Sequence, residues 1–224
     1  MNKLEKNKFI NAGLYPLLFI TIIGLIFFIQ SVFELPLYQY GIFPRTLKGL
    51  IGIIAAPLLH GDIKHLFNNS IPLLILGTAL FYFYKEIAFK VSVWIYLMVG
   101  IWTWVSAREA YHIGASGLLY GLFSFLLVSG FIRKSKQLIA LSFVVIFIYG
   151  SLVWGILPID IKISFEGHLW GFVAGIVLAI YYRRQGPQEK EYTWQDDDID
   201  EEDDYWNKGE DEVTYIYKPR QDKT

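Results

Sequence analysis

The 224-residue chain contains no cysteine and only two methionines. Without cysteine there can be no disulfide, no thiolate nucleophile and no cysteine-based metal site, so any covalent chemistry must use oxygen or nitrogen. The sequence also lacks a His-Glu-x-x-His motif, which disfavours a common class of zinc enzymes. We therefore expect the protein to work without a metal and without a cofactor.

Charged residues are also scarce, at 18% of the chain, whereas 54% of the residues are hydrophobic and 17% are aromatic. This composition is too apolar for a soluble domain of this length and indicates a membrane protein. We predict an all-α membrane protein with a six-transmembrane-helix bundle, because six apolar stretches are long enough to cross about 30 Å of hydrocarbon. They lie at 13–33, 66–84, 91–105, 116–132, 138–157 and 165–182.

One further apolar stretch, 49–59, is not counted among the spans. It ends in a proline and a polar cluster, and helices usually end at or before the residue that precedes a proline. We interpret this stretch as a loop or a partly embedded segment.

Basic residues predict the orientation of the bundle. Ten lysines and arginines fall on the side of the two termini and five on the other side, which places both termini in the cytoplasm. The first apolar stretch is longer than the core of a signal peptide and no cleavage signal follows it, so we interpret it as a retained anchor. The expected location is the bacterial inner (plasma) membrane, as a multi-pass protein.

The last part of the chain differs in charge from the rest. Residues 1–182 hold 13 basic and 7 acidic residues, whereas residues 183–224 hold 7 basic and 14 acidic residues. We divide the chain into a cytoplasmic N-terminal segment (1–12), a membrane domain (13–182) and an acidic tail (183–224) that is expected to be mostly disordered. Its aromatic residues could form a docking motif for a partner, or could be incidental: Trp194, Tyr205, Trp206, Tyr215 and Tyr217. Nothing in the sequence suggests nucleic-acid binding.

A short glycine-rich motif marks the start of the fourth predicted helix. Ser116 lies in Gly114-Ala115-Ser116-Gly117, where a polar loop gives way to an apolar run, so it should occupy the first turn of a buried helix. Gly114 and Gly117 let other backbones come close, and the free N–H groups of a first turn can stabilise an oxyanion. The motif by itself is equally compatible with simple packing.

Two other predicted helices carry polar residues at their starts. His65 and Asn69 are four residues apart, hence on one face of the second helix. His168 opens the sixth helix, three residues before the Gly171-x3-Gly175 pair that permits close approach of another helix. The predicted topology puts these helix starts and Ser116 on the same, external side of the membrane. Polar groups inside membrane helices are costly, so each is a functional candidate.

These groups support acyl transfer. A serine hydroxyl needs a base to take its proton, and a neutral imidazole is suited to that role near pH 7. We assign Ser116 as nucleophile and His168 as base. His65, Asn69 and the Ser116 N–H could stabilise the oxyanion. No acidic residue stands out as a third member, so we predict a dyad, with Glu166 at the helix start pointing elsewhere or supporting the turn.

With these residues in view, residues 40–182 resemble the rhomboid family of intramembrane serine proteases. The resemblance rests on His60-x4-His65-x3-Asn69, Gly114-Ala-Ser116-Gly117, Tyr120 and His168-x2-Gly171-x3-Gly175. It implies a six-helix core, cleavage of membrane-anchored protein substrates near the external side of the bilayer, and packing of Tyr120 on the His168 imidazole. His60 is interpreted as structural, helping to hold the first external loop.

One departure from the family concerns that loop. Some members carry a Trp-Arg pair there, whereas this chain has Phe43-Pro44-Arg45-Thr46, so the sequence does not show how the loop is anchored. An alternative function is a non-catalytic rhomboid-like protein that binds client transmembrane segments, although such relatives generally lack the serine or the histidine. A small transporter is disfavoured because the helices become almost wholly apolar beyond their outer turns.

Overall fold

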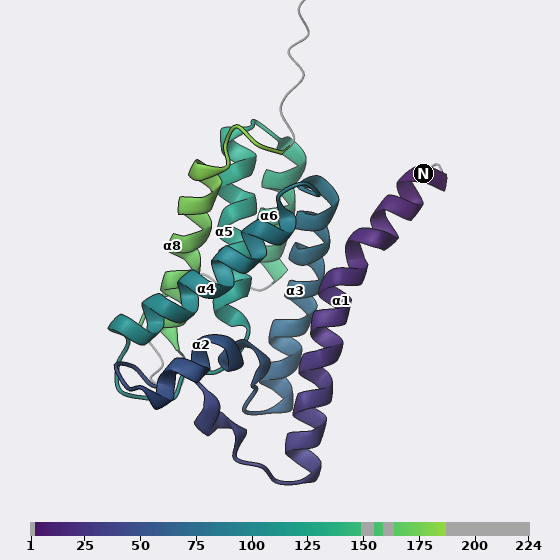
Figure 1. Ribbon diagram of the computed structural model, residues 1–224. Coiled ribbons are helices and arrows are strands. Elements are labelled where there is room, and N and C mark those ends of the chain that lie inside the picture. Colours follow the sequence, from purple (N-terminus) through teal and green to yellow (C-terminus); the bar gives the residue numbers. More distant parts are fainter. Residues whose placement is uncertain (1–2, 149–154, 159–163, 187–224) are drawn as a thin grey trace, which may run out of the picture. The chain divides into compact units, whose positions relative to one another are not determined.

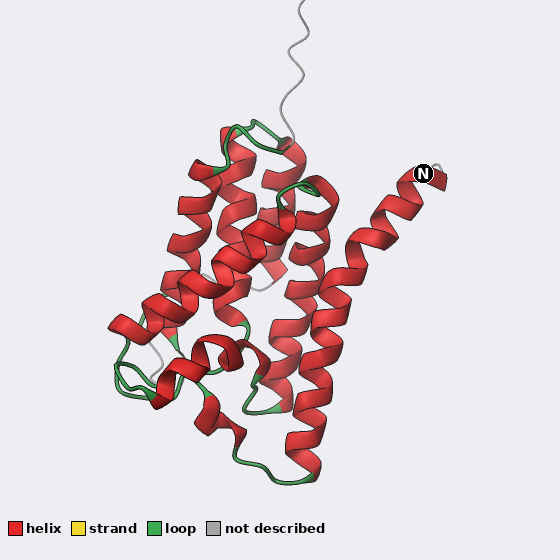
Figure 2. Cartoon of the chain, in the orientation of Figure 1, coloured by secondary structure: helices red, strands yellow, loops and turns green. Residues whose placement is uncertain are grey.

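The computed structural model describes residues 3–148, 155–158 and 164–186, and all the elements named below belong to these ranges (Figure 1). Six longer helices make up most of this part of the chain: α1 Lys3–Val32, α3 Ile63–Phe83, α4 Ala88–Ser106, α5 Ser116–Ile132, α6 Lys136–Ile148 and α8 Phe165–Tyr181. Within the described ranges there is no β-strand, only an isolated bridge between Ile42 and His112 (Figure 2). The expectation of an all-α protein is confirmed for these residues.

Among the described residues, three helices are long and apolar enough to cross a membrane: α1, α3 and α4. The apolar helices α5 and α8 have 17 residues each. The number of six spans stays a prediction. Residues 149–154 of the predicted fifth span lie outside the described residues, as does the tail from residue 187 onward. Large hydrophobic side chains are exposed along the helices, among them Leu25, Phe28 and Phe147, as expected for surfaces that face lipid.

Helix α1 begins at Lys3, well before the predicted span at 13–33. The first turns contain Lys3, Glu5, Lys6 and Lys8, which are all good helix formers in a polar environment. An apolar run marks only the part of a helix that faces hydrocarbon. Helix α1 is longer than its apolar run because it continues into the polar residues before it.

The stretch 49–59, expected as a loop or partly embedded segment, consists of short helical turns. Lys48–Ile51 (η2), Gly52–Ala55 (α2) and Ala56–Leu58 (η3) follow one another directly. Proline is compatible with the first turn of a helix, where its missing N–H has no partner to lose, and Pro57 occupies such a position in η3. A side chain at Gly49 or Gly52 would overlap the backbone of residues 41–43, so these glycines let the turns pack on the preceding loop.

The loop between α1 and α3 is anchored to the end of α4 by residues of the Phe43-Pro44-Arg45-Thr46 stretch. The Arg45 guanidinium donates a 2.7 Å hydrogen bond to the Ala107 carbonyl, and the Arg45 N–H donates to the Trp104 carbonyl at 3.0 Å. In return, the Trp104 indole N–H donates to the Thr46 carbonyl at 2.9 Å. The structure thus shows an anchor for this loop that does not need a Trp-Arg pair.

Helix α5 occupies the centre of the bundle, with 12 of its 17 residues buried. It contacts α3, α4, α6 and α8, and it crosses α8 with backbones in close approach. The crossing uses glycines on both helices, Gly117 and Gly121 on α5 and Gly167, Gly171 and Gly175 on α8. A Cβ on Gly171 would overlap the Gly117 carbonyl oxygen, and one on Gly175 would overlap that of Gly121. The glycine pair noted in the sequence therefore faces α5.

Arg133 joins the other ends of α5 and α8. It lies just after α5 and is 8% exposed, and its guanidinium donates hydrogen bonds to the carbonyls of Tyr182 at 2.7 Å and Gln185 at 2.6 Å. These carbonyls lie at the end of α8, where backbone oxygens have no partner within the helix. Arg133 is one of the ten basic residues counted above for orientation, and in the structure it is buried and holds two helices together.

Candidate functional site

Ser116 is the first residue of α5, and the loop before it has an unusual backbone conformation. Gly114 has a φ of +108°, which is strongly disfavoured for residues with a side chain. Its N–H donates a 2.8 Å hydrogen bond to the Ala56 carbonyl of the first loop. A Cβ on Gly114 would lie 2.6 Å from Nε2 of His65 and 3.4 Å from Nδ2 of Asn69. The glycine thus allows two polar side chains of α3 to come next to the loop that carries Ser116.

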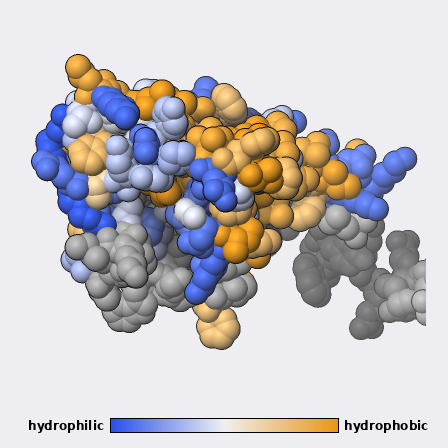
Figure 3. Space-filling view, turned by 90° about the horizontal axis from the view of Figure 1, so that it is seen from below, coloured by the Kyte–Doolittle hydropathy of each residue, from blue (hydrophilic) through white to orange (hydrophobic). Residues whose placement is uncertain are grey.

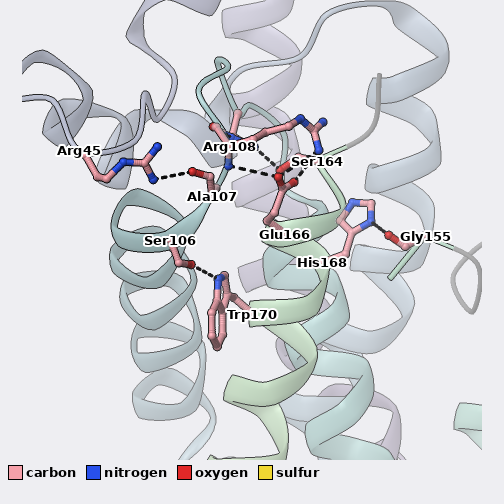
Figure 4. A network of polar contacts seen from close by, with 10 residues as sticks. Arg45, Ser106, Ala107, Arg108, Gly155, Ser164, Glu166, His168 and Trp170 are labelled. Atoms are coloured by element: carbon pink, nitrogen blue, oxygen red, sulfur yellow. Dashed lines mark hydrogen bonds and ion pairs between the residues drawn. The ribbon is translucent and has the colours of Figure 1, made fainter. Parts of the chain in front are cut away.

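His168 reaches Ser116 from the first turn of α8. Its Nε2 lies 2.7 Å from the Ser116 Oγ, and its Nδ1 lies 2.8 Å from the Gly155 carbonyl oxygen (Figure 4 shows this second contact). A carbonyl can only accept a hydrogen bond, so we assign the ring proton to Nδ1, which leaves Nε2 to accept from the serine hydroxyl. The Tyr120 ring, one turn after Ser116, stacks on the imidazole with centroids 4.3 Å apart and planes inclined by 14°.

His60 stands behind the His65 and Asn69 pair. It is 1% exposed, its Nε2 lies 3.0 Å from Nδ2 of Asn69, and its ring packs edge-on against His65 at 4.9 Å. Because the Asn69 amide nitrogen is a donor, His60 Nε2 accepts, and one hydrogen of the amide remains for another acceptor. The His60 carbonyl also accepts from Gln30 Nε2 at 3.1 Å, which ties the loop to α1.

The pKa of His60 is lowered from 6.5 to about 4, mainly by burial and in second place by the neighbouring His65. Between these two values the unfolded chain binds a proton that the folded chain does not, so the free energy of unfolding rises with pH there. Acidification from pH 6.5 to about 5 should cost about 2 kcal/mol through this residue alone. We expect His60→Gln to reduce the loss of stability between pH 7 and pH 5 by about that amount.

The measurement is an SDS titration in mixed micelles at both pH values, followed by circular dichroism. The other histidines are retained in both proteins, so the difference between wild type and His60→Gln reports the titration of His60 together with its coupling to the neighbouring His65. Identical pH dependence in the two proteins would contradict this account of His60.

The structure brings into the site two groups that the sequence analysis did not single out. Gly155 supplies the carbonyl next to His168, in the place where a carboxylate stands in a triad. His112 is 4% exposed, its Nδ1 lies 2.6 Å from the Ser164 Oγ, and its Nε2 lies 3.1 Å from the Arg108 carbonyl. Burial lowers the pKa of His112. A backbone carbonyl has no signature in a sequence, and His112 appears there as one histidine in a polar loop.

Among the described residues, Glu166 pairs with Arg108 rather than with His168. The Arg108 Nη1 lies 3.0 Å and 2.9 Å from the two Glu166 carboxylate oxygens, and the Arg108 backbone N–H adds a contact of 3.3 Å (Figure 4). The carboxylate is mostly buried and lies in the first turn of α8, where negative charge is favourable. This pair connects the loop after α4 to the helix that carries His168.

A narrow cavity lies beside Ser116. It has a volume of about 30 Å³ and is lined by residues of α4, α5, α8 and the loops, including Thr103, His112 and Ser164. This is enough space for a water molecule, and the Thr103 Oγ, which has no hydrogen-bond partner within the described residues, offers it a polar contact. Within those residues, no group of three or more His, Asp or Glu side chains could hold a metal ion.

The bundle and its site define a class of membrane protein: apolar helices that enclose a hydrogen-bonded serine and histidine at one end. Figure 3 views the molecule from that end and shows hydrophilic residues gathered beside an extensive hydrophobic surface. The Rhomboid domain family matches residues 48–185. The chain is 36% identical to the uncharacterized protein Rv1337 of Mycobacterium tuberculosis over 201 residues. This aligned region covers 83% of this chain and 80% of the relative.

A second relative, the uncharacterized protein ML1171 of Mycobacterium leprae, is 35% identical over 191 residues, or 80% of this chain and 74% of the relative. The chain belongs to the rhomboid family. The resemblance seen in the sequence motifs is thereby confirmed.

Proposed function

We propose that this protein is an intramembrane serine endopeptidase that hydrolyses peptide bonds of membrane-anchored proteins with a Ser116–His168 dyad. The observation that carries the proposal is the 2.7 Å contact between Ser116 Oγ and His168 Nε2, with the imidazole oriented from its other side by the Gly155 carbonyl. A nucleophile within hydrogen-bond reach of a base, which is itself held by a third group, is the arrangement that acyl transfer requires.

In the proposed reaction, His168 Nε2 takes the hydroxyl proton as Ser116 Oγ attacks the carbonyl carbon of the scissile bond. Charge then develops on the carbonyl oxygen. The proposed donors to this oxygen are the free hydrogen of the Asn69 amide, the His65 ring and the Ser116 N–H; the first two lie next to Gly114. His168 returns the proton to the leaving amine, and a water molecule then hydrolyses the acyl-enzyme by the same steps in reverse order.

Tyr120 and His60 would hold the catalytic and oxyanion-binding side chains in position. Tyr120 stacks on the imidazole and restricts its rotation, while His60 holds the Asn69 amide in one orientation. The glycines would allow close approach of the segments that carry these side chains. The absence of a side chain at Gly114 leaves space for His65. Gly117, Gly171 and Gly175 bring α8 close enough to α5 for His168 to reach Ser116.

The proposed substrates are transmembrane proteins that reach the site from the bilayer, with cleavage near its external side. The placement in a bacterial inner membrane with both termini in the cytoplasm is part of the same proposal and rests on the distribution of basic residues in the sequence.

A fluorophosphonate probe tests the proposal directly. We expect the folded protein in proteoliposomes to form one adduct, which mass spectrometry of its peptides places on Ser116, and to cleave a model transmembrane substrate. The buried Ser124, which donates a 2.8 Å hydrogen bond to the Phe172 carbonyl in α8, is an internal control that should stay unlabelled. Folded protein that neither labels nor cleaves, across several substrates, would favour the non-catalytic protein that binds client segments.

A further inference from the structure

An apolar trough runs between the membrane helices, outside the proposed active site. It has a volume of about 480 Å³, which falls within the range of ligand pockets, about 300–1,000 Å³. Its walls are faces of α1 and α4, its floor is formed by α3 and α5, and Ile54 of α2 closes one end. Figure 1 shows α1 lying along α3 while α4 crosses the bundle obliquely.

The lining of the trough suits hydrocarbon and offers little to a polar ligand. Nearly all of its residues are apolar. Two of the few polar residues have hydroxyl groups that form hydrogen bonds within the protein. Ser92 Oγ donates to the Ala88 carbonyl at 2.9 Å, and the Tyr96 hydroxyl donates to the Ile54 carbonyl. Because these groups are satisfied within the protein, an apolar occupant leaves none of them without a hydrogen bond.

The dimensions of the trough match those of one lipid chain. The α4 wall extends from Phe89 to Leu97, which is about 12 Å at 1.5 Å per residue. One leaflet of the hydrocarbon core is about 15 Å thick, half of about 30 Å. The trough is open along its length, since Leu18 and Phe89 in its walls are 62% and 69% exposed. A chain could therefore enter sideways from the bilayer.

Several lysines are close in sequence to the residues that form the end of the trough away from the active site. Tyr15, Phe81 and Phe89 form this end, close in sequence to residues 1–12 and 84–90. These two segments contain five lysines and two glutamates, and all five lysines are exposed: Lys3, Lys6, Lys8, Lys85 and Lys90. Lys8 lies two helical turns before Tyr15, hence on the same side of α1. A negatively charged headgroup is favoured at such an end.

We propose that this trough binds an acyl chain of an anionic phospholipid, with the chain between α1 and α4 and the phosphate among the lysines at the end marked by Phe89. The bound chain also touches the proposed active site indirectly. Tyr96 and Leu118 line both the trough and the cavity beside Ser116, and the Tyr96 hydroxyl holds the Ile54 carbonyl two residues before Ala56. The Ala56 carbonyl in turn accepts from Gly114 N–H.

The test is photolabelling of the full chain in vesicles of phosphatidylcholine and phosphatidylglycerol that contain a trace of phosphatidylglycerol with a diazirine on its acyl chain. Adducts should concentrate on residues 15–22 and 89–97, several-fold above lipid-facing residues outside the trough such as Val177. The same diazirine chain on phosphatidylcholine should label these residues less, and Lys8→Gln should narrow that difference.

Two variants fill the trough from opposite walls, and each has a matched control on the same helix. Val93→Trp and Ile22→Trp should reduce labelling of the lining several-fold, whereas Val105→Trp and Ile29→Trp, at exposed positions outside the trough, should not. Thermal unfolding of all four variants establishes that they are folded. Labelling spread evenly over the exposed apolar surface, or unchanged by both filling variants, would overturn the proposal. So would preferential labelling of the trough by a diazirine-bearing transmembrane peptide, which would make the occupant a helix.

Discussion

Ser116→Ala and His168→Ala should each reduce the cleavage of a transmembrane substrate by about 10⁴-fold or more, and the double variant should be no slower than either single variant. Ser116 Oγ is the attacking atom in the proposed reaction, and His168 Nε2, 2.7 Å away, is the only base placed to take its proton among the described residues. Neither residue can work without the other, so removing both costs what removing one costs.

The measurement is the rate of product formation in proteoliposomes for the wild type and the three variants, together with fluorophosphonate labelling. The oxyanion-stabilising groups remain in every variant, so any residual rate above background is expected to be the same in all three. A double variant slower than both single variants by the product of their effects would show that Ser116 and His168 act independently, which contradicts a dyad. Ser124→Ala is the control for loss of a buried serine. This variant should keep the contact between Ser116 and His168 intact.

Gly171→Ala should destabilise the protein by about 3 kcal/mol, the upper part of the usual range for overpacked sites. The added Cβ would overlap the Gly117 carbonyl oxygen on α5, and backbone atoms on two crossing helices cannot move aside as a flexible side chain can. The helices must separate, which also moves His168, three residues earlier on α8, away from Ser116. We therefore expect fluorophosphonate labelling to fall together with stability.

The matched control is Gly24→Ala on α1, where an added Cβ meets nothing within 4 Å. In a helix interior this substitution changes stability by about 1 kcal/mol or less, and in the favourable direction. Unfolding by SDS in mixed micelles, followed by circular dichroism, compares both variants with the wild type. If Gly171→Ala and Gly24→Ala unfold at the same SDS fraction, the close α5–α8 contact is not what holds these helices together.

The polar candidates of the site could be found from the sequence because a membrane chain has few of them. Ser116, His65, Asn69 and His168 each stand at the start of an apolar helix, and a polar group at such a position is expensive unless it has a use. Helix parity and the distribution of lysines put these starts on one side. The structure places them together at one end of the described bundle, within the distances given above.

Two features of the site, and one at the opposite end of α5, had no such signature. The Gly155 carbonyl is one backbone oxygen among 224, and only the fold brings it to His168 Nδ1. His112 acts through contacts with residues 52 and 4 positions away, and Arg133 is buried although its position after a helix reads as surface charge. A contact between residues far apart in the chain depends on where the helices cross, which no local pattern records.

The chain's apolar runs, its glycine spacing and its polar helix starts are local properties, and they were sufficient to establish a helical membrane protein of the rhomboid family and the residue types available for chemistry. The tertiary structure alone decided which partner each polar group has: Glu166 with Arg108 rather than His168, and Asn69 with His60. It also created the trough between α1 and α4. The physical reason is that helix formation depends on nearby residues, whereas hydrogen-bond partners and cavities depend on how closely separate helices can approach, and here glycines set that distance.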